Sequence, residues 1–113
     1  MTKHITIRKA PGTWVVRAGG AVLGETANAM ELSEGDHEPV IYFPRADVGM
    51  AFLEPTQTST HSPHKGEASY FSIVTMAETL KDAAWSYEAP IDGAAGIKDL
   101  LAFAPDRVTV EQL

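Results

Sequence analysis

Apolar and polar residues alternate along several short stretches of this chain, with the period of two that is typical of half-buried β-strands. Gly19-Gly20 separates two of these stretches, and this pair can adopt the positive φ angles of a tight hairpin turn. The polar residues 34–39 separate another two in the same way. We therefore expect strands over residues 4–8, 14–18, 21–26, 29–33, 40–43 and 107–111.

Pro44 ends one of these predicted strands, because proline cannot donate a hydrogen bond within a central strand. Its fixed φ instead favours a single helical turn over residues 44–48, and residues 50–53 are then expected to be extended. The segment 56–62 is rich in threonine and serine. We expect it to be a polar loop that leads into the next strand.

In the second half of the chain, residues 67–74 and 80–87 are expected to form a further strand pair, although 77–84 is equally compatible with a helix by propensity. Residues 91–101 are the best candidate for a short helix. Short strands separated by turns, with one or two short helices, favour a mainly β fold. The expected architecture is a barrel-like arrangement or a sandwich of two antiparallel sheets, in a single domain over residues 1–113.

Composition excludes several classes of function. The 113 residues include no cysteine, which removes disulfides, a thiolate nucleophile and cysteine-ligated zinc. The net charge of -6 has the wrong sign for a protein that grips a phosphate backbone, so we expect no nucleic acid partner. No apolar run approaches the roughly 20 residues of a membrane-spanning helix. We expect a cytoplasmic protein that does not associate with membranes.

The segment THSPHKG, residues 60–66, concentrates chemically active side chains. His61 and His64 can act as general acid or base, and Lys65 can stabilise a developing negative charge or hold an anion. The alternative is that the histidines only form hydrogen bonds within a loop and that the lysine is only solvated. Two imidazoles without an identifiable third ligand do not predict a metal site, and we expect no cofactor.

Three further charged residues are candidates for ligand binding. Arg45 and Glu54 each lie among apolar neighbours, where a charge needs a partner. They can pair with each other, or Arg45 can bind an anion. Asp82 can cap a turn before Ala83, or it can orient His61 or His64.

Aromatic residues form a second group of candidates. Trp85 and Tyr87 share one face of a predicted strand, and Tyr70 is expected on the neighbouring strand. Such an aromatic wall either completes the core or lines a pocket for a flat or cationic ligand. The remaining large rings are assigned to the core, namely Trp14, Phe43, Phe52 and Phe103.

Several segments together resemble the small, mostly bacterial proteins of domain-of-unknown-function family 427. They cover most of the chain from residue 40 onward: 42–48 (YFPRADV), 53–55 (LEP), 60–66 (THSPHKG), 68–71 (ASYF), 82–87 (DAAWSY) and 102–108 (AFAPDRV). The resemblance implies a β-tent fold, in which two antiparallel sheets meet at an angle. This agrees with the predicted strands.

The family carries a nucleotidyltransferase-like label, to which this sequence lends little support. Many members have cysteine where Ser62 stands, and tyrosine often replaces His64, so thiol chemistry is not carried over. Nucleotidyl transfer needs clustered carboxylates that hold magnesium. The tight cluster Glu34-x-Asp36-x-Glu38 is better explained as a solvated acidic turn, and no glycine-rich phosphate loop precedes a helix.

Two functions from different classes follow. The first is a module that binds a small polar or anionic molecule in a cleft lined by aromatic and basic residues. The alternative is a small enzyme, nucleotidyltransferase-like or hydrolytic, that uses His61, His64 and Lys65. Association through an open strand edge, including homodimer formation, stays open.

Overall fold

The computed structural model describes residues 4–113 as a mainly β structure. The strands are β1 (Ile5–Lys9), β2 (Trp14–Ala18), β3 (Ala21–Thr26), β4 (Met30–Glu34), β5 (Val40–Tyr42), β6 (Leu53–Ser62), β7 (Gly66–Val74), β8 (Thr79–Ser86), β9 (Ala102–Phe103) and β10 (Thr109–Gln112). Short 3-10 helices occupy η1 (Arg45–Asp47), η2 (Met50–Phe52) and η3 (Asp92–Ile97). Within these residues, no helix has the length and apolar character required to cross a membrane.

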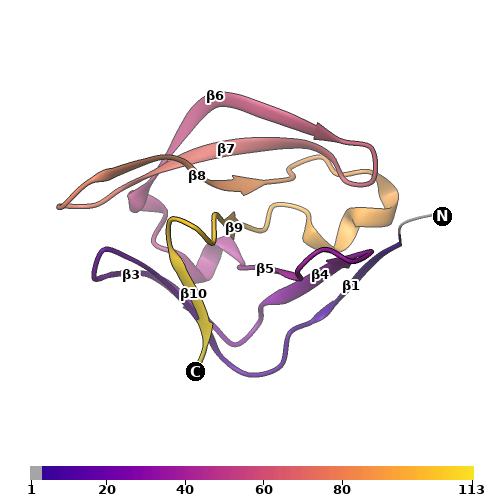
Figure 1. Ribbon diagram of the computed structural model, residues 1–113, viewed down its shortest axis with the longest axis horizontal. Helices are drawn as coiled ribbons and strands as arrows, with labels where there is room; N and C mark the ends of the chain where they lie inside the picture. Colours follow the sequence, from indigo (N-terminus) through magenta and orange to yellow (C-terminus); the bar gives the residue numbers. More distant parts are fainter. Residues whose placement is uncertain (1–3) are drawn as a thin grey trace.

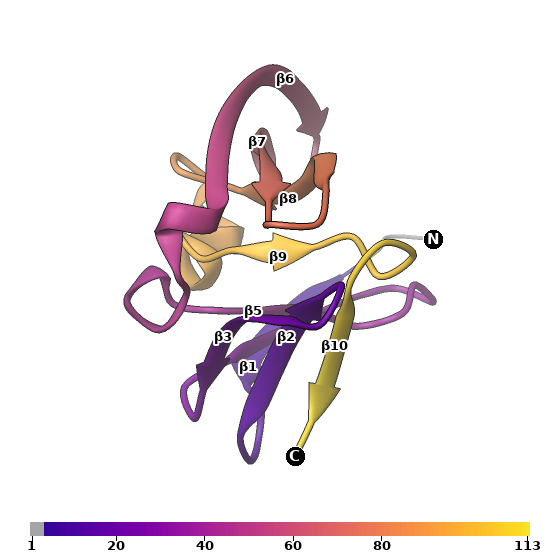
Figure 2. The ribbon, with the colours of Figure 1, turned by 90° about the vertical axis from the view of Figure 1, so that its left-hand side faces the viewer.

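The strands form open antiparallel sheets, ordered β1-β4-β5, β10-β2-β3 and β6-β7-β8-β9. Figure 1 shows β6, β7 and β8 lying above β5 and β9. In Figure 2, β6 curves over β7 and β8. The predicted mainly β class with antiparallel sheets and short helices is confirmed, and the described strands do not close into a barrel.

The hydrophobic core consists of two clusters on opposite faces of β5. Phe43, which follows β5, belongs to the larger cluster, where its ring meets Phe103 edge-on at a centroid distance of 5.6 Å. Tyr42 belongs to the second cluster, together with Leu32 and Tyr87. Successive side chains of an extended chain point to opposite faces, so β5 and the residue after it supply one large buried ring to each cluster.

Local signals predicted the first half of the chain well. Gly19 and Gly20 both have positive φ, at 53° and 88°, and they join β2 to β3 as expected. The expected helical turn is present as η1, although it is shorter than predicted and Pro44 is its extended N-cap instead of its first helical residue. The strands around residues 34–39 also form and pair with each other as β4 and β5.

Two segments differ from the prediction. Residues 50–52 form the turn η2 instead of an extended segment, because the Phe52 N–H donates to the Gly49 carbonyl at 2.9 Å. The expected polar loop 56–62 is the outer part of β6, which pairs with β7 over residues 53–55 and again over residues 59–62. An edge strand that leaves its side chains in water has no alternating burial to read, while threonine favours the extended backbone.

One backbone bridge, just outside β5 and β9, joins the sheets that contain these two strands. The Phe43 N–H donates to the Leu101 carbonyl at 2.8 Å, and the Leu101 N–H donates to the Phe43 carbonyl at 2.9 Å. Within residues 4–113, β5 and β9 share only this isolated bridge. An antiparallel ladder would continue with Tyr42 opposite Ala102 and then Ile41 opposite Phe103, and neither pair forms. The two strands therefore diverge beyond the bridge.

Candidate functional site

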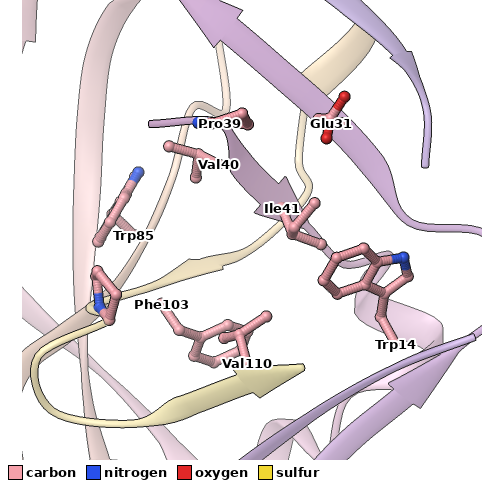
Figure 3. Close-up of a pocket in the computed structure, with 9 residues that line it drawn as sticks. Trp14, Glu31, Pro39, Val40, Ile41, Trp85, Phe103 and Val110 are labelled. Atoms are coloured by element: carbon pink, nitrogen blue, oxygen red, sulfur yellow. The ribbon is translucent and has the colours of Figure 1, made fainter. Parts of the chain in front are cut away.

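A cavity of about 350 Å³ opens where β5 and β9 diverge. Figure 3 shows Val40 and Ile41 of β5 on one side of it and Phe103 with Val110 of β10 on the other. Since Ile41 and Phe103 both line the space, the cavity lies where the missing part of the ladder would have run. Its lining consists of Trp14, Glu31, Pro39, Val40, Ile41, Trp85, Phe103, Pro105 and Val110.

Two indole rings border the cavity from opposite sides (Figure 3). The Trp14 N–H donates to the Pro11 carbonyl at 3.0 Å. The Trp85 indole lies beside the Tyr42 hydroxyl, and this contact lowers the pKa of Tyr42 against the stronger raising effect of burial. Because the Trp14 N–H is already engaged, the Trp14 ring offers mainly carbon atoms to the cavity. The Trp14 hydrogen bond also holds the orientation of its ring before any ligand arrives.

Glu31 is the charged member of the cavity lining. Its Oε1 accepts a hydrogen bond from the Arg8 Nε at 2.9 Å, across the β1-β4 register. The Glu31 side chain is 19% exposed, whereas Arg8 is 70% exposed. Among the described residues, no lysine, arginine or histidine lines the cavity. A ligand there would therefore meet apolar walls and one carboxylate.

Trp85 is the one predicted ligand-binding residue that lines this cavity. Tyr70 packs against it with a centroid distance of 6.2 Å, and the Tyr70 hydroxyl shares a hydrogen bond with Thr60 at 3.1 Å. Tyr87 is buried in the second core cluster beside Tyr42. Burial raises the pKa of Tyr87 above its ordinary value. The predicted group of aromatic residues is therefore present, and Trp85 is the member of the group that lines the cavity.

Lys65 lies in the turn between β6 and β7, away from the cavity lining. Its Nζ donates to Glu34 Oε1 at 3.1 Å and lies 5.7 Å from the centre of the Tyr87 ring. Glu34 is therefore not part of a solvated acidic turn, since its side chain is only 15% exposed. Burial raises the pKa of Glu34, but the hydrogen bond and charge of Lys65 outweigh it, so the pKa is lowered overall.

The two predicted catalytic histidines lie on the same hairpin. His61 is exposed near the end of β6. His64 is half-buried in the turn, where its backbone N–H donates to Ser62 Oγ at 3.3 Å. Within residues 4–113, no three histidine, aspartate or glutamate side chains are grouped so that they could hold a metal ion. The acid or base role of His61 and His64 stays a prediction.

Arg45 pairs with Glu88 instead of Glu54. Its Nη2 donates to Glu88 at 2.8 Å and to Ser86 Oγ at 3.0 Å, and its Nε donates to the Asp99 carbonyl at 2.7 Å. The guanidinium also lies 5.6 Å from the centre of the Phe71 ring. These contacts join η1 to the end of β8. Glu54 is exposed on β6.

Asp82 accepts hydrogen bonds from two threonines of β6. The Thr56 hydroxyl donates at 2.7 Å and the Thr58 hydroxyl at 2.8 Å, and these bonds lower the pKa of the carboxyl group. Its backbone has a positive φ of 53° at an irregular point of the β7-β8 pairing. In this arrangement Asp82 orients β6 rather than His61 or His64.

Trp14 and Glu31 are the important cavity residues that the sequence did not indicate. Trp14 was assigned to the core, which is partly correct because it is half-buried against the larger cluster. Trp14 alternates with the buried residues Val16 and Ala18 of β2, which predicts an inward side chain. This alternation does not predict that the space beside the ring is empty. Glu31 alternates regularly within β4, so its pattern gives no sign of a cavity.

The comparisons with known proteins identify a family but no activity. No curated protein matches the chain. The match to a family model extends over residues 6–112, which includes every strand that contributes to the cavity. The chain therefore belongs to the family described as a domain of unknown function (DUF427).

Proposed function

We propose that this protein is a binding module for a small, flat, mainly apolar molecule, which occupies the cavity between β5, β8 and β9. The observation that carries the proposal is the cavity itself, with its two indole rings. Its volume of about 350 Å³ falls in the range of about 300–1,000 Å³ of ligand pockets in proteins. A flat ring system could contact Trp14 and Trp85 at once.

The backbone around the cavity supports the same function. The Phe43 N–H and carbonyl both point toward β9. By strand alternation, those of Ile41 point the same way, toward the diverging Phe103. Backbone polar groups in such a position need a partner from water or from a ligand. They offer a donor and an acceptor to a molecule that otherwise makes apolar contacts.

The geometry favours this reading over the two that the sequence suggested. An anionic ligand would find no basic side chain among the described lining residues, and it would meet Glu31. The enzyme alternative depends on His61, His64 and Lys65, none of which lines the cavity. Lys65 is moreover already paired with Glu34.

A neutral naphthalene dye with environment-sensitive emission tests the proposal. Both tryptophans of the chain line the cavity, so energy transfer from tryptophan to the dye reports binding there. Val110→Phe should fill part of the cavity and weaken dye binding about tenfold or more. Val22→Phe is the matched control, because Val22 lies 54% exposed on β3 of the same sheet.

Saturable binding that Val110→Phe weakens and Val22→Phe preserves would support the proposal. Failure of the dye to bind, or equal binding to both folded variants, would contradict it. Thermal unfolding of each variant shows that it is folded at the assay temperature.

A further inference from the structure

The cavity lining combines aromatic rings with a carboxylate, and this combination points to the charge of the ligand. We propose that the cavity selects cationic molecules that carry an alkylated ammonium group. This inference rests on the proposed function, since it names the class of ligand for the same cavity.

The rings supply the first part of the argument. Trp14, Trp85 and Phe103 all line the space. The surface of an aromatic ring attracts cations, and tryptophan does so most strongly. The Trp14 N–H, which would repel a cation, is engaged with the Pro11 carbonyl. An alkylated ammonium suits such a lining because its methyl groups pack against the rings while its charge interacts with their π electrons.

Glu31 supplies the second part. Arg8 binds its Oε1, and within residues 4–113 no hydrogen bond engages its Oε2. Because Arg8 is 70% exposed, water screens its charge and the pair contributes little. The Glu31 side chain is only 19% exposed and belongs to the cavity lining, so little water separates its carboxylate from a ligand. A ligand cation can compete with Arg8 for this carboxylate.

The net charge of the whole chain also favours a cationic ligand. With fifteen acidic and nine basic residues, the protein has a net charge of -6. Such a field raises the local concentration of cations and slows the approach of anions. The preference should therefore weaken as the ionic strength rises.

The inference is tested with a pair of molecules of the same shape, choline and 3,3-dimethyl-1-butanol. They differ chiefly in the charged nitrogen, which is a neutral carbon in the second molecule. Isothermal titration calorimetry measures both affinities directly, because it needs no optical signal from either molecule. We expect choline to bind about fivefold to tenfold more tightly than the neutral molecule.

Two substitutions should move the affinity in opposite directions. Glu31→Gln removes the carboxylate charge and should weaken choline binding about fivefold, without affecting the neutral molecule. Arg8→Gln removes the competing cation and should strengthen choline binding about twofold to threefold. The matched controls Glu25→Gln and Lys81→Gln change the same charges at exposed positions outside the lining, and should leave both affinities nearly unchanged.

The outcomes separate the two proposals. If the naphthalene dye binds but choline shows no advantage over 3,3-dimethyl-1-butanol, the cationic preference is overturned and the binding module stands. If Glu31→Gln leaves choline binding unchanged, or if choline binding is unaffected by Val110→Phe, the assigned site is overturned. If neither the dye nor choline binds, both proposals fail.

Discussion

The ion pair between Lys65 and Glu34 should contribute a measurable part of the stability of this protein. It joins the turn between β6 and β7 to the end of β4, two parts of the chain that belong to different sheets. The perturbation we consider is the replacement of each partner by methionine, which keeps an apolar chain of similar length but removes the charge. Lys65→Met leaves the Glu34 carboxylate with little solvent around it.

The expected size of the effect follows from the burial of the pair. Removing one partner of a fully buried ion pair costs about 3–5 kcal/mol. Here the side chains of Lys65 and Glu34 are 17% and 15% exposed, so water still reaches the charge that remains. We therefore expect each single substitution to lower the free energy of unfolding by about 2–3 kcal/mol. The double variant should lose less than the sum, because two methionines can pack together without an unpaired charge.

Urea unfolding of the wild type, both single variants and the double variant gives the coupling energy directly. Urea is preferred to guanidinium because it adds no ions that screen the pair. We expect a coupling energy of about 1–2 kcal/mol. Additive effects of the two substitutions, within about 0.5 kcal/mol, would refute the reasoning, since they would mean that the charges do not interact.

The same pair predicts a dependence on pH with a definite sign. Although burial opposes it, Lys65 lowers the pKa of Glu34 in the folded protein. The unfolded chain therefore binds the proton more readily, and the contribution of the pair is fully present above the unfolded pKa of about 4.3. It is lost as the pH falls through the lower folded value. The stability difference between wild type and Lys65→Met should shrink over that acidic range and stay constant near neutral pH.

Two further substitutions test the packing. Gly24→Ala would place a Cβ atom 2.7 Å from the Asp47 carbonyl oxygen and should cost about 2–3 kcal/mol in urea unfolding, whereas Gly93→Ala meets nothing within 4 Å and should change stability by less than about 0.5 kcal/mol. Equal effects of the two changes would contradict the packing around Gly24. Phe43→Leu removes a fully buried ring from its edge-on contact with Phe103 and should cost about 1–3 kcal/mol by the same measurement.

Most of the fold could be predicted because its signals are local. The turn at Gly19-Gly20 needs only two residues that tolerate positive φ, and the helical turn after Pro44 needs only a fixed φ. Strand β6 could not be read in this way. Most of its side chains stay in water, and it is held by backbone pairing with β7 and by the hydrogen bonds of Thr56 and Thr58 to Asp82. Such pairing leaves no pattern in the sequence.

The candidate site could not be predicted from the sequence, for a different reason. The segment around Lys65 attracted attention because it gathers charged and titratable side chains, yet a dense set of such groups does not create a concave surface. The structure instead uses the Lys65 charge to hold Glu34, a partner 31 residues away. The positions that do line the cavity, such as Ile41 and Phe103, are apolar residues of regular strands.

Core and cavity walls are built from the same residue types, so composition cannot tell them apart. What distinguishes them here is that the ladder between β5 and β9 stops after the Phe43 and Leu101 bridge. Beyond that bridge β5 and β9 do not pair, and their edges face an open space instead of continuing the core. Trp14, from a different sheet, then borders this space. Where strands diverge is a property of three-dimensional packing, and it decides which of the apolar residues can meet a ligand.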